Sequence, residues 1–443
     1  MLQIPVHCHP SQVFAKDSSA SGKSRYRAAP SVALPVSSTT TTIHDAISAT
    51  QVRVVALCAL VTLIEGIDLT LIPLLAPKIT QAWSVPAATF GIILSSGPIG
   101  LIAGGLGVGY LADRIGRRNA LIAAMLLMTV ATLATMFARN VPELLICRLV
   151  TGISFGGVIP VAVALVSESL PPRVRASVVA FVFLGQAGGG LLAALLVKLP
   201  LAAGAWQTPV LYVGGGCAVV TVLIMALLPE SPRYLSLTGP RNRLRDLFTE
   251  GRAIGTSLLW ATFIGVCFAV SFFTNWLTLI FTHAGKPSEV GVNAIAVYSA
   301  GAMFGGLVLP LFTRRWHTNN VLLASIAGAV VSCVGLGLAL PLSNTVNLVV
   351  ATLCGVFVSG AFFMLFPPAA RFYPTHIRST GIGAAVAFGR IGNMLSPAAA
   401  GFMLGAGIAP ATVFYAVAVP MALSCVALVA FHRLTTESAD ARD

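Results

Sequence analysis

Four ionisable side chains stand inside long apolar runs of the sequence: Glu65, Asp68, Arg148 and Arg390. A charged side chain at the centre of a bilayer costs about 2.5–3.5 kcal/mol on insertion scales, so such residues are functional candidates. Glu65 and Asp68 lie three residues apart, which places both carboxylates on one face of a helix. Two neighbouring carboxylates in a low dielectric favour keeping a proton on one of them. The pair is therefore predicted to couple to protons, the alternative being two packing acids neutralised by an arginine.

The two arginines are the cations available to these acids. A guanidinium stays charged and can hold a carboxylate with two parallel hydrogen bonds. Arg148 is predicted to partner the acids at Glu65 and Asp68 and to share in proton coupling. Arg390, near the middle of its apolar run, is the candidate for binding an anionic substrate. Structural ion pairing alone is the alternative for both.

Three further residues are candidates for contact with a flat ring. Asn275 and Trp276 stand side by side deep in one apolar run, and Phe388 precedes Arg390 by two residues. An aromatic ring packs well against aromatic side chains, and an amide side chain can form a hydrogen bond with a polar group on the ring. Most aromatic residues in membrane helices merely pack or face lipid, which is the competing interpretation.

A second charged group lies at the ends of the apolar runs and is interpreted as a gate. Glu168 ends one run, close in sequence to Arg175. It is expected to meet the loop that contains Asp113, Arg114, Arg117 and Arg118. An ion-pair cluster of this kind can hold one conformational state and break in another.

The composition identifies the setting of these charges as a membrane. Of the 443 residues, 56% are hydrophobic and only 9% are charged, against about 25% charged in an average soluble chain. This excludes a cytosolic enzyme, a secreted disulfide scaffold and a disordered chain. The net charge of +13 does not indicate a nucleic-acid partner, because the basic residues lie between apolar runs. The predicted surroundings are the lipid bilayer.

Twelve continuous apolar runs are long enough to cross a bilayer, which takes about 20 residues per helix. The predicted fold class is an all-α integral membrane protein with 12 transmembrane helices. The runs cover about 52–75, 89–111, 120–138, 144–168, 178–198, 209–228, 255–282, 291–312, 321–341, 347–370, 380–404 and 411–432.

The distribution of Lys and Arg predicts the orientation. With the N-terminus inside, 21 of the 27 basic residues fall in inside segments, four fall outside and two lie within spans. Both termini are therefore expected in the cytoplasm of a multi-pass protein of the inner (plasma) membrane. Residues 1–51 are polar and basic without an apolar core, which predicts a disordered cytoplasmic tail; a transit peptide or an early start codon are alternatives. The eight cysteines sit singly, so no disulfide, metal site or cofactor is expected.

An internal repeat divides the chain into two halves. The string from Gly104 to Arg114 aligns with Gly305 to Arg315, an offset of 201, and Glu168 to Ser177 aligns with Arg371 to Thr380, an offset of 203. Parallel repeats of this kind place a binding site near the midplane between the halves and serve alternating access. The predicted organisation is a tail (1–51), a six-helix bundle (52–228), a cytoplasmic linker (229–254), a second six-helix bundle (255–433) and a short tail (434–443).

Several strings resemble a known family. Gly109–Arg118 (GYLADRIGRR) resembles the signature loop of the major facilitator superfamily, and Pro229–Leu235 (PESPRYL) resembles a second marker of that superfamily. The chain is most similar to the aromatic acid:proton symporters, through Glu65–Asp68 (EGID), the helix pattern from Arg148 to Pro160, and Arg390 with Gly392. The resemblance covers roughly residues 50–430.

The resemblance implies the major facilitator fold and import of an aromatic carboxylate, such as a hydroxybenzoate, protocatechuate or benzoate, with a proton. It implies that Glu65 and Asp68 take the coupling positions, that both arginines are essential, and that Asp113 and Arg117 belong to the gating loop. Two positions depart from the pattern. Glu65 stands where an Asp is usual, and Arg314 occupies the place that corresponds to Asp113 in the repeat.

Other functions stay open at this point. A proton-coupled importer of another organic acid is one, and a drug:proton antiporter is another. The second is disfavoured because Gly185–Gly190 lacks the proline of the exporter motif. A non-transporting sensor that binds the acid is a third, weaker alternative. A membrane enzyme is the weakest, since the sequence holds no nucleophile–base pair, phosphate loop or metal cluster. Because one chain encloses a complete two-half site, a functional monomer is expected.

Overall fold

The computed structural model describes residues 48–199, 204–230, 244–249, 251–374 and 377–440. Most of the predicted tail (1–51), much of the predicted linker and residues 441–443 lie outside this described part. Helices dominate the described residues, in the order α1 (Ala49–Trp83), α2 (Ala87–Ile115), α3 (Arg117–Thr135), α4 (Val141–Ser169), α5 (Pro172–Val197), α6 (Gln207–Leu227), η3 (Leu244–Phe248), α7 (Ala253–His283), α8 (Ser288–Phe312), α9 (Thr318–Ala339), α10 (Asn344–Cys354), η4 (Gly355–Ser359), α11 (Gly360–Met364), α12 (Phe366–Phe372), α13 (Arg378–Gly405) and α14 (Pro410–Asp440).

The described residues contain twelve helical segments at the places of the twelve predicted runs, with α10 to α12 forming one segment. Ten helical segments are long and apolar enough to cross a membrane, and α5 contributes a shorter apolar stretch, Phe181–Val197. The twelfth segment, α13, is 28 residues long but carries polar residues in its middle. The first helix runs to Trp83, beyond the predicted boundary at 75, because its last turns remain packed: Ile79 is completely buried.

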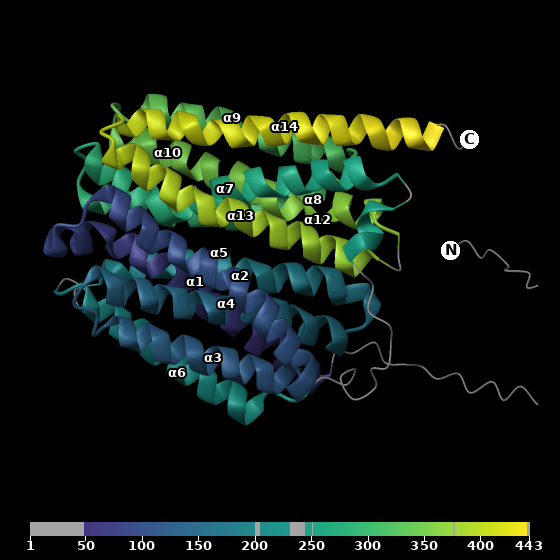
Figure 1. Cartoon of the computed structure of the whole chain (residues 1–443), viewed down its shortest axis with the longest axis horizontal. Coiled ribbons are helices and arrows are strands. Elements are labelled where there is room, and N and C mark those ends of the chain that lie inside the picture. The colour runs from purple at the N-terminus through teal and green to yellow at the C-terminus, as the bar shows by residue number, and fades with distance from the viewer. Residues whose placement is uncertain (1–47, 200–203, 231–243, 250, 375–376, 441–443) are drawn as a thin grey trace, which may run out of the picture. The chain divides into compact units, whose positions relative to one another are not determined.

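The helices form two bundles, α1 to α6 and α7 to α14, and Figure 1 shows them side by side. In the first bundle α2 packs on α4, α1 on α5 and α3 on α6. In the second, α13 and α14 pack on α7, and α8 packs on the α10 segment. The bundles meet through the pairs α2–α13, α5–α8 and α1–α7. These three interfaces position the site described below.

Close contact between α2 and α4 depends on glycine. A Cβ atom added at Gly104 would overlap the carbonyl of Ile153 on the facing helix, whereas one added at Gly107, a turn further along α2, would meet open space. Small residues at such crossings let two backbones approach each other within the membrane. Substitution of Gly104 and of Gly107 therefore distinguishes the effect of packing at the helix interface from the general effect of replacing a glycine in a helix.

We predict that Gly104→Ala lowers the unfolding midpoint of the purified protein, because overpacking costs typically about 1–3 kcal/mol. Gly107→Ala is the matched control and should leave the midpoint equal or slightly higher, since Ala favours helix over Gly. Thermal unfolding of both variants in detergent, followed by tryptophan fluorescence, measures the difference. Equal midpoints for the two variants would contradict the packing account.

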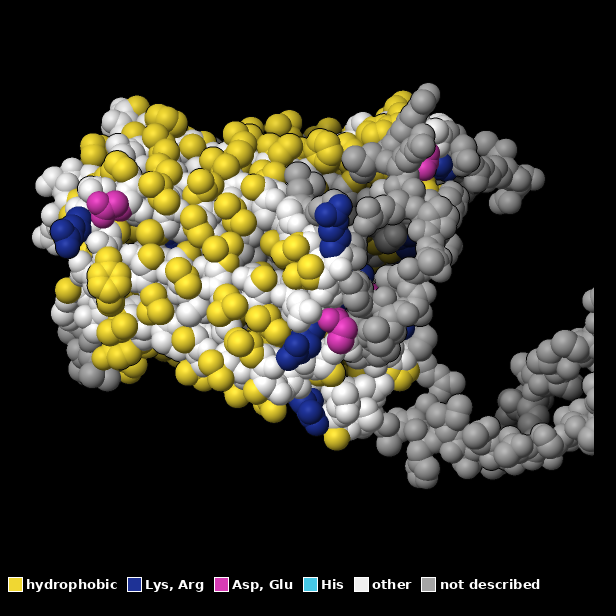
Figure 2. Space-filling view, turned by 60° about the horizontal axis from the view of Figure 1, so that its bottom comes forward, with side chains coloured by type: hydrophobic (Ala, Val, Ile, Leu, Met, Phe, Trp, Pro, Cys, Tyr) yellow, Lys and Arg dark blue, Asp and Glu magenta, His cyan; other side chains and the backbone are white. Residues whose placement is uncertain are grey.

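The flank of the helices is apolar. Figure 2 shows hydrophobic side chains spread over this face, while the charged side chains gather at its two ends. Large side chains are widely exposed on several helices, among them Val130, Val219, Val331 and Leu423. Such a surface suits contact with lipid acyl chains, so this belt marks the part of the molecule that crosses the bilayer.

One end of the bundles, called here the basic end, carries Arg114, Arg117 and Arg118 where α2 meets α3.

The short helix η3 packs against the second bundle. Leu247 is completely buried, and its carbonyl accepts a hydrogen bond from the Thr256 hydroxyl at 3.0 Å. The segment just before α7 is therefore anchored to the second bundle.

Candidate binding site between the bundles

A cavity of about 200 Å³ lies between the two bundles. Its wall on the first bundle comes from α1, α2, α4 and α5, and its wall on the second from α7, α8, the α10 segment and α13. Apolar and aromatic side chains alternate with amides and hydroxyls. The lining includes Leu69, Thr70, Pro73, Leu94, Pro98, Arg148, Phe155, Gln186, Ser271, Thr274, Asn275, Tyr298, Phe362, Phe363 and Asn393. This is the mixed character of a pocket for a small, partly polar molecule.

A buried ion pair stands beside the cavity. Asp68 in α1 is completely buried and Arg148 in α4 is 7% exposed. An Nη atom of Arg148 lies 3.6 Å from the Asp68 carboxylate. Thr132 of α3 donates a hydrogen bond to the other carboxylate oxygen at 2.9 Å, and Arg148 also donates to Thr135 at 3.5 Å. Three helices of the first bundle thus hold the pair that the sequence led us to expect.

Arg148 connects this ion pair to the cavity. Among the described residues that line the cavity it is the one Lys or Arg, whereas Asp68 lies behind it. Its Nε atom has no hydrogen-bond partner within the described part of the chain. A guanidinium in this position can hold Asp68 on one side and an incoming anion on the other.

The other two ionisable candidates, Glu65 and Arg390, lie outside the cavity wall. Glu65 is 1% exposed, and its Oε2 atom has no hydrogen-bond partner among the described residues. Arg390 of α13 interacts electrostatically with Glu65 from the other bundle. One Nη atom of Arg390 donates to the Leu101 carbonyl of α2 at 2.8 Å. In this structure Arg148, rather than Arg390, is the arginine that lines the cavity.

The residues predicted to contact an aromatic ring also differ in their positions relative to the cavity. Asn275 lines the cavity, but its neighbour Trp276 does not. Trp276 is completely buried, and its indole N–H donates to the Pro397 carbonyl of α13 at 3.1 Å. One residue along an α-helix turns the side chain by about 100°, so Asn275 and Trp276 cannot share a face. In this structure Trp276 packs between α7 and α13, outside the cavity lining.

Phe388 is likewise displaced from the cavity. Its ring stacks on Trp260 of α7 with centroids 3.8 Å apart, and Phe248 of η3 packs against the same indole at 5.3 Å. These rings anchor η3 and α7 to α13.

Three residues that line the cavity were not predicted from the sequence: Phe155, Gln186 and Asn393. The signal for Asn393 was its place three residues after Arg390, within the polar middle of α13.

The predicted gating residues form contacts within the first bundle. Arg117 at the start of α3 lies 3.2 Å from the Glu168 carboxylate at the end of α4. Arg118 donates to the Leu228 and Met225 carbonyls, both at 2.6 Å. These contacts tie the ends of α3, α4 and α6 together at the basic end.

The remaining gating candidates lie around this cluster. The backbone N–H of Arg118 donates to the Glu230 carboxylate at 3.0 Å, and Arg175 donates to the Leu170 carbonyl at 3.1 Å. Arg114 is exposed at the last turn of α2, and the side chain of Asp113 lies outside the described part of the structure. The described contacts connect the ends of α3, α4 and α6 with the segment that follows α6.

The comparisons with known proteins agree with this arrangement. The sequence profile of the Major Facilitator Superfamily matches residues 58–397. The chain belongs to the major facilitator superfamily. This confirms the predicted family and fold, and makes the chain a multi-pass membrane transport protein.

Two relatives of similar sequence are transporters of aromatic acids. A 3-(3-hydroxy-phenyl)propionate transporter of Escherichia coli is 35% identical over 354 residues, covering 80% of this chain and 87% of the relative. The 4-hydroxybenzoate transporter PcaK of Pseudomonas putida is 30% identical over 422 residues, covering 86% and 92%. Among solved structures, a D-xylose-proton symporter shares the fold, with a TM-score of 0.72 and 18% identity over 86% of this chain and 97% of that one.

Proposed function

We propose that this transporter imports an aromatic carboxylate together with a proton, by alternating access, across the inner membrane of the cell. The relatives named above support the aromatic acid, since their names give a hydroxyphenylpropionate and a hydroxybenzoate as cargo. The Lys and Arg asymmetry of the sequence supports cytoplasmic termini. The cavity lies within one chain, which supports a functional monomer.

The observation that carries the proposal is the buried pair of Asp68 and Arg148 at the edge of the cavity. A substrate carboxylate that enters the cavity competes with Asp68 for one guanidinium. With Asp68 ionised, two negative charges would face one positive charge in a low dielectric, which is costly. With Asp68 protonated, the substrate carboxylate takes its place and the site stays neutral. Proton and substrate therefore favour each other's binding, as symport requires.

Glu65 and Arg390 are proposed as a second coupling pair, because the buried Glu65 carboxylate of the first bundle interacts electrostatically with the Arg390 guanidinium of the second. Rocking of one bundle against the other changes their separation, and with it the stability of a charged Glu65. The cluster around Arg117 and Glu168 is proposed to act together with the Glu65–Arg390 pair, as part of the gate at the basic end.

Uptake into cells that express the protein tests the proposal. Labelled benzoate, 4-hydroxybenzoate, protocatechuate and 3-(3-hydroxyphenyl)propionate are offered at external pH 6 and 8, with and without a protonophore. We expect accumulation of at least one acid, faster at pH 6, that collapses when the protonophore is added. Facilitated equilibration without accumulation would exclude proton symport. Extrusion of a toxic compound with no acid uptake would favour the drug antiporter instead.

A further inference from the structure

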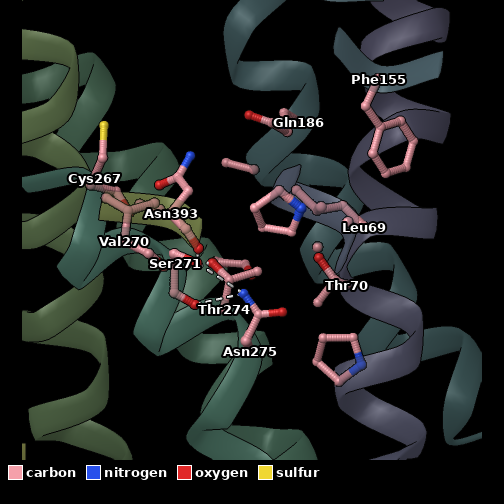
Figure 3. Close-up of a pocket in the computed structure, with 18 of the residues that line it drawn as sticks. Leu69, Thr70, Phe155, Gln186, Cys267, Val270, Ser271, Thr274, Asn275 and Asn393 are labelled. Atoms are coloured by element: carbon pink, nitrogen blue, oxygen red, sulfur yellow. Dashed lines mark hydrogen bonds between the residues drawn. The ribbon is translucent and has the colours of Figure 1, made fainter. Parts of the chain in front are cut away.

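We propose that Asn275 selects aromatic acids that carry a hydrogen-bond donor, such as a hydroxyl group, on the ring. The inference rests on the proposed function and deepens it by narrowing the substrate class. It concerns the wall of the cavity that belongs to the second bundle, where Asn275, Ser271 and Asn393 lie together (Figure 3). The ring-donor site is the name used below for the Asn275 side-chain oxygen and the space in front of it.

A chain of hydrogen bonds fixes the orientation of the Asn275 amide. Its Nδ2 atom donates to the Ser271 carbonyl at 2.7 Å and to the Ser271 hydroxyl at 3.2 Å. The Ser271 hydroxyl in turn donates to the Asn393 backbone carbonyl at 3.0 Å. Because a backbone carbonyl only accepts, the nitrogen of Asn275 must face Ser271 and the oxygen must face away.

The free end of the amide is therefore an acceptor. Figure 3 shows the Asn275 oxygen pointing away from Ser271, toward the helix that carries Thr70. Asn275 is 9% exposed, and no protein donor to its Oδ1 is found among the described residues. An acceptor that is mostly removed from water gains most from a ligand that brings a donor, and loses if the ligand covers it without one.

Arg148 and Asn275 line the cavity from different bundles and have opposite preferences. Arg148 of α4 offers only donors and a positive charge, which suits a carboxylate. The ring-donor site of α7 offers an acceptor, which repels a carboxylate and suits a phenolic hydroxyl. A hydroxylated aromatic acid can satisfy both and touch both bundles at once, whereas unsubstituted benzoate satisfies only the first. A methoxy group has no hydrogen to donate, so a methoxy acid is expected to bind no more tightly than benzoate.

Competing uptake of closely related acids tests this inference directly. Initial rates in cells give the kcat/KM of benzoate, 3- and 4-hydroxybenzoate, and 3- and 4-methoxybenzoate. We expect at least one hydroxy acid to exceed benzoate about tenfold, and both methoxy acids to fall at or below benzoate. In Asn275→Leu the ratio of hydroxy acid to benzoate should approach one. Thr282→Val is the control, because this hydroxyl lies on the same helix outside the cavity and bonds the Thr278 carbonyl.

The outcomes separate this inference from the proposed function. Equal uptake of hydroxy acid and benzoate by the wild type, or methoxy acids taken up as well as hydroxy acids, would overturn the ring-donor site while leaving aromatic acid transport in place. A hydroxyl preference that survives in Asn275→Leu at normal surface expression would also overturn it. If no aromatic acid of the panel enters the cells, the proposed function itself fails. The wild-type series needs no variant, so misfolding of Asn275→Leu cannot hide the answer.

Discussion

Asp68→Asn is expected to abolish proton-driven accumulation of the aromatic acid while leaving exchange of labelled for unlabelled acid across the membrane. The amide is close in size to the carboxylate and can still face Thr132 and Arg148, so the site keeps its shape. It carries no proton that can be released, and it leaves Arg148 permanently available to the substrate. The inside-to-outside ratio of the acid should therefore approach the value for an uncoupled carrier. Uptake and counterflow in membrane vesicles with an imposed pH gradient measure both quantities.

The matched control for this substitution is Glu289→Gln, which neutralises an exposed acid in the first turn of α8. It should accumulate acid as the wild type does. Accumulation by Asp68→Asn that still collapses with a protonophore would remove Asp68 from coupling and leave Glu65 as the residue to test. Loss of both accumulation and counterflow, in a variant that unfolds at the normal temperature, would show that Asp68 positions Arg148 rather than carrying the proton.

Arg148→Gln is expected to have the largest effect on binding. The substitution removes the cation that lines the cavity and leaves Asp68 buried without its partner. Breaking a buried ion pair by removing one member costs about 3–5 kcal/mol. We expect no uptake, a lower unfolding midpoint, and no stabilisation of the purified protein by added substrate. Thermal unfolding with and without 4-hydroxybenzoate measures the last two.

Two further variants make this prediction specific. Asp68→Asn combined with Arg148→Gln should recover much of the lost unfolding midpoint but not the uptake, because the double variant no longer buries an unpaired charge. Arg390→Gln should lose transport rate yet keep stabilisation by substrate, since Arg390 bonds Leu101 and lies off the cavity wall. Stabilisation kept in Arg148→Gln and lost in Arg390→Gln would reverse the roles and make Arg390 the carboxylate site.

Much of the fold could be predicted from the sequence because its signals are local. Run length and apolarity define a membrane-spanning helix, and the two repeated strings define two halves, whatever the helices pack against. The ionisable residues could be found in the same way, since a charge in an apolar run is visible without tertiary structure. The pairing of Asp68 with Arg148 also followed, because a buried acid needs a cation and few are present.

The composition of the cavity could not be predicted in the same way. Which face of a helix meets the cavity depends on how the helix is rotated by its neighbours, and no local signal gives that rotation. Asn275 and Trp276 are adjacent in sequence, yet one lines the cavity and the other binds Pro397. Likewise Arg390 is central in its helix, but α13 presents it to Leu101 and Glu65 instead of to the cavity.

The prolines of the cavity wall bear on how the molecule moves. Pro73 in α1 and Pro98 in α2 each follow another wall residue, Leu69 or Leu94, by four positions. Proline has no N–H, so the carbonyls of Leu69 and Leu94 lack their usual helical donor, and a helix bends most easily where this bond is missing. Both bending points lie at the level of the cavity. The proposed substrate thus binds at the level where α1 and α2 bend. The half of each helix on either side of the cavity can change its direction, while the residues that contact the substrate move little.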